Sequence, residues 1–171
     1  MRRWSVVVMV ALSSCGTEEV PPTSPTPGGT CPLYEVPSGI DLTQPVVSFK
    51  NEVMPIFNAT CNSGSCHGSS LKPAGGVFLG SEAARGGDAS SVRMGLVGAA
   101  AQEMPSMPLV TPGDPAKSFL MHKLDADQCA FAGQCTIGNC GALMPNGSSM
   151  PLPPTNRDQV RRWIAQGAKD N

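Results

Sequence analysis

Apolar side chains recur at helical spacing in several stretches of the chain, and long polar segments rich in glycine and proline separate them. The first stretch predicts a helix whose apolar face is formed by Phe49, Val53, Ile56 and Phe57. Ser48 stands where an N-terminal cap is expected. Pro55 removes a backbone donor within the stretch, so an interruption is expected there, and the helix should end just before Cys61.

Two weaker helices are predicted in the middle of the chain. One covers residues 89–98, with Val92, Leu96 and Val97 as its apolar positions. The other follows a turn at residues 111–115 and carries Phe119, Leu120 and Leu124 on or near one face. Asp114 is a suitable N-cap for it, and Pro115 suits the first helical position.

The last helix has the clearest pattern. Its buried face should consist of Val160, Trp163 and Ile164. Thr155 is expected to cap it, with Asp158 three residues on as in a capping box, and Gly167 should end it. In no segment do apolar and polar residues alternate in the way that is typical of a β-strand. The sequence therefore predicts a small all-α domain with few helices and long loops over residues 46–171.

The N-terminus has the features of an export signal. Arg2 and Arg3 precede an apolar run at residues 4–12, which is too short to cross a bilayer. The following Leu-Ser-Ser-Cys resembles the bacterial lipobox, which implies that residues 1–14 are a signal peptide and that Cys15 is lipidated. An ordinary secretory signal with an incidental cysteine is the alternative.

Composition adds constraints on the rest of the chain. Residues 15–45 are rich in proline, threonine and glycine in their first half and are expected to form a flexible tether.

The formal net charge of -1, without a basic run, argues against nucleic-acid binding. Glycine and proline number 19 and 17 of 171 residues. A loop-rich domain of this kind buries little apolar area and usually needs disulfides, a metal or a large cofactor.

The segment with the most specific chemistry runs from Cys61 to Cys66 and His67. Covalent haem attachment uses two thiols and an adjacent histidine that ligates the iron, usually as C-x-x-C-H. Here the spacer has four residues, but the second cysteine and the histidine remain adjacent. A cysteine pair at this spacing in an exported protein can also be a simple disulfide.

A haem iron ligated by His67 can take a second ligand from far along the chain. Met144 lies in a loop before the last helix, and thioether ligation is typical of electron-transfer haems. Met150, which also precedes a proline, and His122 are the alternatives. Most methionines serve in packing, so position alone distinguishes Met144.

The order of these segments resembles the cytochrome c domains of exported proteins from environmental bacteria. The matching pieces are FNATC, CHG, AGGVFLG, VTPGDPAKSFL, the MP of MPNG, and RRWIAQGA, over residues 46–171. The resemblance implies a cytochrome c-like fold and haem c as cofactor. It makes Cys61 and Cys66 the thioether sites, His67 the proximal ligand and Met144 the distal ligand. The four-residue spacer departs from the usual motif.

An even set of cysteines remains after the lipid and haem positions, namely Cys31, Cys129, Cys135 and Cys140. In an exported chain this suggests two disulfides, with three connectivities open, and one loop cysteine could reach back to Cys31. A zinc site made by the three loop cysteines is the alternative, although they lack a C-x2-C pair.

These features predict one-electron transfer by a c-type haem at the membrane surface of the cell envelope, with an unknown redox protein as partner. The protein is not expected to be an enzyme, because no Ser/His/Asp set or carboxylate pair is placed for hydrolysis. A haem-free, disulfide-stapled lipoprotein that acts as a binding module is the main alternative. A haem with an open coordination site, used for sensing or peroxide chemistry, is a third.

Overall fold

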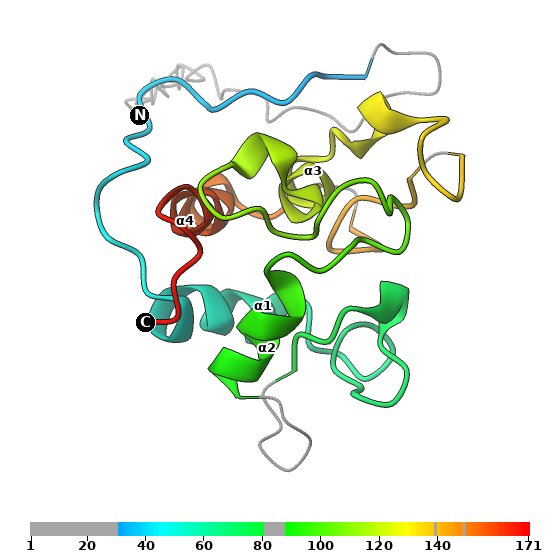
Figure 1. The fold of residues 1–171 in the computed structure, drawn as a ribbon, viewed down its shortest axis with the longest axis horizontal. Helices are drawn as coiled ribbons and strands as arrows, with labels where there is room; N and C mark the ends of the chain where they lie inside the picture. The colour runs from blue at the N-terminus through cyan, green and yellow to red at the C-terminus, as the bar shows by residue number, and fades with distance from the viewer. Residues whose placement is uncertain (1–30, 81–87, 139, 149) are drawn as a thin grey trace, which may run out of the picture.

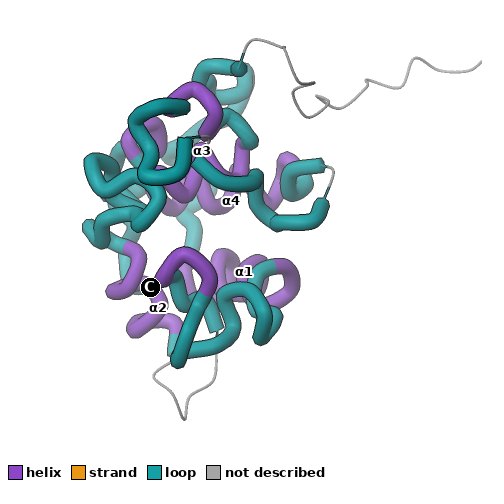
Figure 2. Tube along the Cα trace, turned by 90° about the vertical axis from the view of Figure 1, so that its right-hand side faces the viewer, coloured by secondary structure: helices purple, strands orange, loops and turns teal. Residues whose placement is uncertain are grey.

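The computed structural model describes residues 31–80, 88–138, 140–148 and 150–171. Its four α-helices are α1 (Met54–Thr60), α2 (Ala89–Leu96), α3 (Phe119–Asp125) and α4 (Pro154–Ala165). Over these described ranges there is no strand, only two isolated bridges, so the all-α prediction is confirmed. In Figures 1 and 2, α1 and α2 lie at one end of the domain and α3 and α4 at the other.

The first predicted helix forms in two parts. A π-helical turn over Phe49–Val53 continues directly into α1, and Pro55 lies in the first turn of α1. The predicted interruption is thus a change of helix type at the proline, which cannot donate a backbone hydrogen bond. Ser48 caps the turn as expected, since its hydroxyl accepts from the Asn51 amide at 3.1 Å.

The apolar face of this element is buried as predicted. The Phe49 ring packs on Trp163 of α4, with ring centroids 4.7 Å apart, and meets Phe57 edge-on. Trp163, Val160 and Ile164 are fully buried, which confirms the stripe predicted for α4. This cluster joins the first and last helical elements and forms the centre of the core.

The helix predicted after Asp114 is divided in two. A short 3-10 turn over Pro115–Lys117 comes first, and α3 begins only at Phe119. Ser118 separates them in an extended conformation because its hydroxyl accepts from the Thr111 amide at 2.9 Å and bonds the Asp114 carbonyl at 2.8 Å. A serine that binds nearby backbone groups in this way competes with helix formation.

The predictions for the ends of the other helices are confirmed only in part. The helix expected over 89–98 is α2, with Asp88 as its cap. Thr155 does not cap α4: Pro153 and Pro154 start the helix without a side-chain cap, and Thr155 lies inside it. Asp158 bonds Arg161 instead of closing a capping box.

Residues 31–45, the described part of the predicted tether, lie across the surface of α3 and α4 (Figure 1). The Tyr34 hydroxyl contacts Arg161 Nε at 3.2 Å, and Gln166 Nε2 donates to the carbonyls of Leu42 and Pro45. The predicted signal peptide, Cys15 and the rest of the tether lie outside the described residues. No helix within the described ranges is long and apolar enough to cross a membrane.

The four spare cysteines form two disulfides. Cys31 is bonded to Cys129, 98 residues away, and Cys135 to Cys140 within one loop. The first bond attaches the start of residues 31–45 to the loop after α3. Because all three loop cysteines are used in these bonds, the alternative of a zinc site is wrong.

Asn171, at the carboxyl end of the chain, supplies hydrogen-bond acceptors to the start of the first helical element. Asn171 accepts from the Phe49 amide through Oδ1 at 3.0 Å and from the Lys50 amide through its carbonyl at 3.1 Å. Its carbonyl also accepts from the Ser48 hydroxyl at 2.7 Å. Amide groups at a helix start have no partner within the helix, and here a residue more than 120 positions away supplies acceptors.

Candidate functional site

The Cys61–His67 segment follows directly from α1. Cys61 is the residue that ends the helix, and its amide donates to the Phe57 carbonyl at 2.8 Å. The four-residue spacer then turns back on itself, because the Cys66 amide donates to the Ser63 carbonyl at 2.9 Å. The His67 amide donates to the Cys61 carbonyl at 3.2 Å. The longer spacer is therefore a closed turn that keeps His67 next to the end of α1.

His67 is held by backbone contacts on both sides. Its ring Nδ1 lies 2.8 Å from the Val77 carbonyl oxygen, and its own carbonyl accepts from the Leu79 amide at 2.8 Å. A carbonyl oxygen can only accept, so Nδ1 carries the proton and Nε2 carries the lone pair. Metal-binding histidines typically have this arrangement, in which one nitrogen donates to a backbone carbonyl and the other binds the metal.

Cys61 and Cys66 are free thiols, although the other four described cysteines are oxidised. Burial raises the pKa of the Cys61 thiol, the contact with the Thr60 hydroxyl lowers it, and Cys66 raises it further. The net shift is upward, so Cys61 is a neutral thiol at neutral pH. In this structure the two are not joined in the disulfide that the alternative expects.

One pocket brings together the residues that the sequence singled out. Its walls include Cys61, Cys66, His67 and Met144. Phe57 of α1, Leu96 of α2 and four residues of α3 also line it, so it lies between the two helix pairs. The pocket holds about 1250 Å³ of empty space, part of it open to solvent. Its lining is mostly apolar, with a few polar side chains such as Gln102 and Asn146.

Met144 lies in the pocket wall, and its two alternatives lie elsewhere. The Met144 amide donates to the Lys123 carbonyl at 2.9 Å, which fixes the Met144 backbone against α3. Met150 is 55% exposed and does not line the pocket. His122 does not line it either, and both of its ring nitrogens have partners: Asp127 Oδ1 at 2.9 Å and the Ala116 carbonyl at 3.0 Å.

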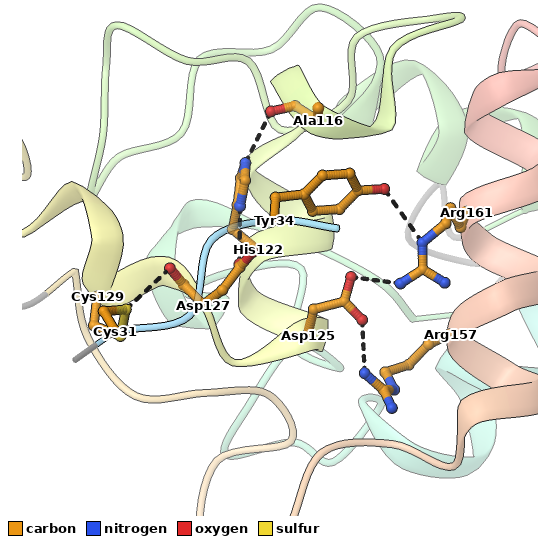
Figure 3. Close-up of polar contacts among 9 residues, drawn as sticks. All are labelled: Cys31, Tyr34, Ala116, His122, Asp125, Asp127, Cys129, Arg157 and Arg161. Atoms are coloured by element: carbon orange, nitrogen blue, oxygen red, sulfur yellow. Dashed lines mark hydrogen bonds and ion pairs between the residues drawn. A yellow bond between two sulfur atoms is a disulfide. The ribbon is translucent and has the colours of Figure 1, made fainter. Parts of the chain in front are cut away.

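Figure 3 shows His122 within a polar cluster between α3 and α4. His122, Asp125 and Asp127 come from α3 and the residues after it, Arg157 and Arg161 from α4. Arg161 is 1% exposed and pairs with Asp125 and Asp158. The cluster joins the two helices and the Cys31–Cys129 disulfide, so we assign it a structural role.

One polar pair in the pocket wall was not predicted. Lys123 of α3 is buried, and its ammonium bonds Glu103 Oε2 at 2.9 Å and the Cys140 carbonyl at 2.7 Å. In the sequence Lys123 is an ordinary helix lysine beside His122. No local signal shows that its side chain points inward, because its partners lie 20 and 17 residues away.

Over the described residues, no group of three or more histidine, cysteine or acidic side chains is placed to hold a metal ion by itself. Comparison of the chain with protein-family models, with curated proteins and with solved structures finds no match.

Proposed function

We propose that this protein is a one-electron carrier that binds haem c covalently in the pocket between the two helix pairs. The single observation that carries the proposal is the shared pocket: two free thiols, an oriented histidine and a thioether line the same apolar cavity. These four side chains come from positions 61 to 144, and folding brings them together without any of them in a disulfide or an ion pair.

The donor set fits the chemistry of haem attachment. Each thiol adds across one vinyl group, so that a C–S bond forms and the thiol hydrogen passes to the other vinyl carbon, with no net oxidation. When bound, the haem supplies an iron that exchanges one electron between its ferric and ferrous states. His67 offers Nε2 as one axial ligand because Nδ1 is committed to the Val77 carbonyl.

Met144 would hold the iron through its soft thioether sulfur as the second protein ligand. Ligation by histidine and methionine raises the potential relative to two histidines and leaves no open position on the iron for oxygen or peroxide. With haem bound, the apolar walls from α1, α2 and α3 would limit the access of water to it. These properties suit electron transfer better than catalysis, and we therefore propose that the protein is not an enzyme.

We further propose that the protein is exported and held at a membrane of the cell envelope by lipid on Cys15, where it exchanges electrons with a protein partner. The signal-like N-terminus supports this proposal. The Cys31–Cys129 disulfide supports it independently, because disulfides form and persist in oxidising compartments.

The test is expression with the native N-terminus in a host that matures c-type cytochromes, followed by a pyridine haemochrome spectrum. A band at the position of a two-thioether haem is expected. A band at the single-thioether position would limit attachment to Cys66. Absence of haem, in a host that matures a control cytochrome, would refute electron transfer and favour the haem-free binding lipoprotein. A Cys61→Ser, Cys66→Ser variant is the matched control and should carry no covalent haem.

A further inference from the structure

Lys123 contacts both ends of the short segment that leads to Met144. Its ammonium donates to the carbonyl of Cys140 at 2.7 Å, and its own backbone carbonyl accepts from the Met144 amide at 2.9 Å. Lys123 is therefore one of the residues that hold residues 140–144 in place, together with the Cys135–Cys140 disulfide. The ammonium also bonds Glu103 Oε2 at 2.9 Å, so the far end of the side chain is fixed as well.

A lysine at this depth is unusual. Burial of an ammonium is costly, and a close carboxylate together with further hydrogen bonds is needed to offset the cost. Glu103 and the Cys140 carbonyl provide these partners. The neighbouring buried positions of α3 include Phe119, Met121 and Leu124, and an apolar residue at 123 would suit a purely structural core as well.

The backbone of residues 140–144 lies close against the ion pair. Gly141 has φ of +72°, and a Cβ atom there would lie 2.7 Å from Glu103 Oε1 and 3.0 Å from Lys123 Nζ. A side chain at this position would force the Glu103 carboxylate or the Lys123 ammonium to shift, so the position of the segment and the geometry of the ion pair depend on each other.

We propose that Lys123 is a positioning residue for Met144, and that its side chain fixes the Met144 segment so that the sulfur stays within bonding reach of the haem iron. This inference rests on the proposed function. A methionine has three rotatable bonds and makes a weak axial bond, so the position of its backbone decides how often the sulfur competes successfully with other ligands. Loss of the ammonium removes its bond to the Cys140 carbonyl and its pair with Glu103, and leaves the segment with less restraint on the side of α3.

The test uses the haem-loaded protein and two measurements. One is the weak long-wavelength absorption of ferric haem with a sulfur ligand, and the other is the affinity of the ferric protein for added imidazole, which must displace the sulfur. Lys123→Met keeps the apolar stem and removes the ammonium. It should weaken the sulfur band and tighten imidazole binding by about tenfold or more, the factor that corresponds to about 1.4 kcal/mol.

Lys117→Met is the matched control. Lys117 has a side chain that is 75% exposed and pairs with Asp114 at 3.0 Å on the surface. This variant should leave the sulfur band and the imidazole affinity unchanged. Equal imidazole affinities of the two variants, with the sulfur band intact in both, would overturn the proposed role of Lys123.

A second variant tests the same contact from the loop side and does not change Lys123. Gly141→Ala inserts a methyl group against the ion pair and should also tighten imidazole binding. Gly133→Ala is its control, because Gly133 has a similar φ of +88° and nothing lies within 4 Å of its Cβ position. If Gly141→Ala behaves like Gly133→Ala, backbone strain alone explains the result and the coupling to the ion pair is absent.

Failure of the proposed function and failure of this inference give different results. Absence of covalent haem in the wild type refutes the electron carrier. Covalent haem without a sulfur band in the wild type removes Met144 as ligand, and with it the role of Lys123, but leaves the haem attachment intact. Covalent haem with a sulfur band that Lys123→Met does not alter refutes only the positioning role.

Discussion

Arg161 Nη2 lies 2.6 Å from Asp125 Oδ2, which joins the last helix to the end of α3 in a site almost closed to solvent. The same carboxylate binds Arg157 through its other oxygen at 2.7 Å (Figure 3). Burial lowers the pKa of Arg161, but the charge and hydrogen bonds of Asp125 and the bond to Tyr34 outweigh it and hold the pKa above its ordinary value.

Asp125→Asn should therefore destabilise the domain by about 3 kcal/mol, because it removes the charged partner of the buried Arg161 guanidinium and of the partly buried Arg157. Urea unfolding measures the change. Asp114→Asn is the control: it removes the charge of an exposed pair but keeps a side chain able to cap the 3-10 turn, and it should cost less than about 1 kcal/mol. Equal costs for the two variants would contradict the structural role of Asp125.

His122 should make the stability depend on pH. Burial lowers its pKa, but the hydrogen bond and charge of Asp127, the Ala116 carbonyl and the charge of Asp125 raise it, and the net shift is upward. The folded protein thus binds this proton more tightly than the unfolded chain. The stabilisation is fully present below the unfolded pKa of about 6.5 and is lost as the pH rises through the folded pKa.

Unfolding free energies of the wild type and His122→Gln between about pH 5 and pH 8 test this. The difference between the two proteins should be largest at the acid end and should shrink as the pH rises. Parallel curves would show that the bond between His122 and Asp127 contributes nothing through protonation.

The two disulfides should differ in their contribution to stability. The Cys31–Cys129 bond spans 98 residues and the Cys135–Cys140 bond spans five. Loop-closure entropy assigns about 4–5 kcal/mol to the first and about 2 kcal/mol to the second. Paired Cys→Ala variants, compared by urea unfolding, should show the larger loss for Cys31 with Cys129. The reverse order would mean that the unfolded chain already restricts the long loop.

Met144 and Met150 provide a direct test of the distal ligand. Met144→Ala should abolish the sulfur band, lower the reduction potential and allow rapid carbon monoxide binding to the ferrous protein, because the axial position becomes vacant. Met150→Ala removes an exposed side chain of the same type and should leave all three properties unchanged. Loss of the band in the second variant instead of the first would make Met150 the ligand.

The sequence predicted those parts of the fold that depend on local pattern. The apolar faces of the first and last helices, the Ser48 cap and the end of α1 before Cys61 follow from residues within one or two turns of each other. The prediction that Thr155 caps the last helix is wrong because two prolines precede this residue. Pro153 and Pro154 already fix the backbone at the helix start, so the helix begins before the threonine.

The parts that the sequence did not predict depend on contacts between distant residues. Four cysteines permit three connectivities, and only the folded chain shows which pairs meet. Residues 31–45 have no helical or strand periodicity, so their attachment to α3 and α4 through Tyr34 and Gln166 has no signal in the local pattern. The inward position of Lys123 depends in the same way on Glu103 and Cys140.

The contact of Asn171 with Ser48 and Phe49 has a consequence for the order of events during synthesis. A chain made from its amino end presents Cys61 and Cys66 roughly a hundred residues before Asn171. Until then, the helical element before these cysteines lacks both its acceptor for the first amides and its packing partner, Trp163. Both thiols are therefore presented on an incompletely folded chain. On the proposed function, this is the state in which a haem-attaching enzyme would meet them, before the domain closes.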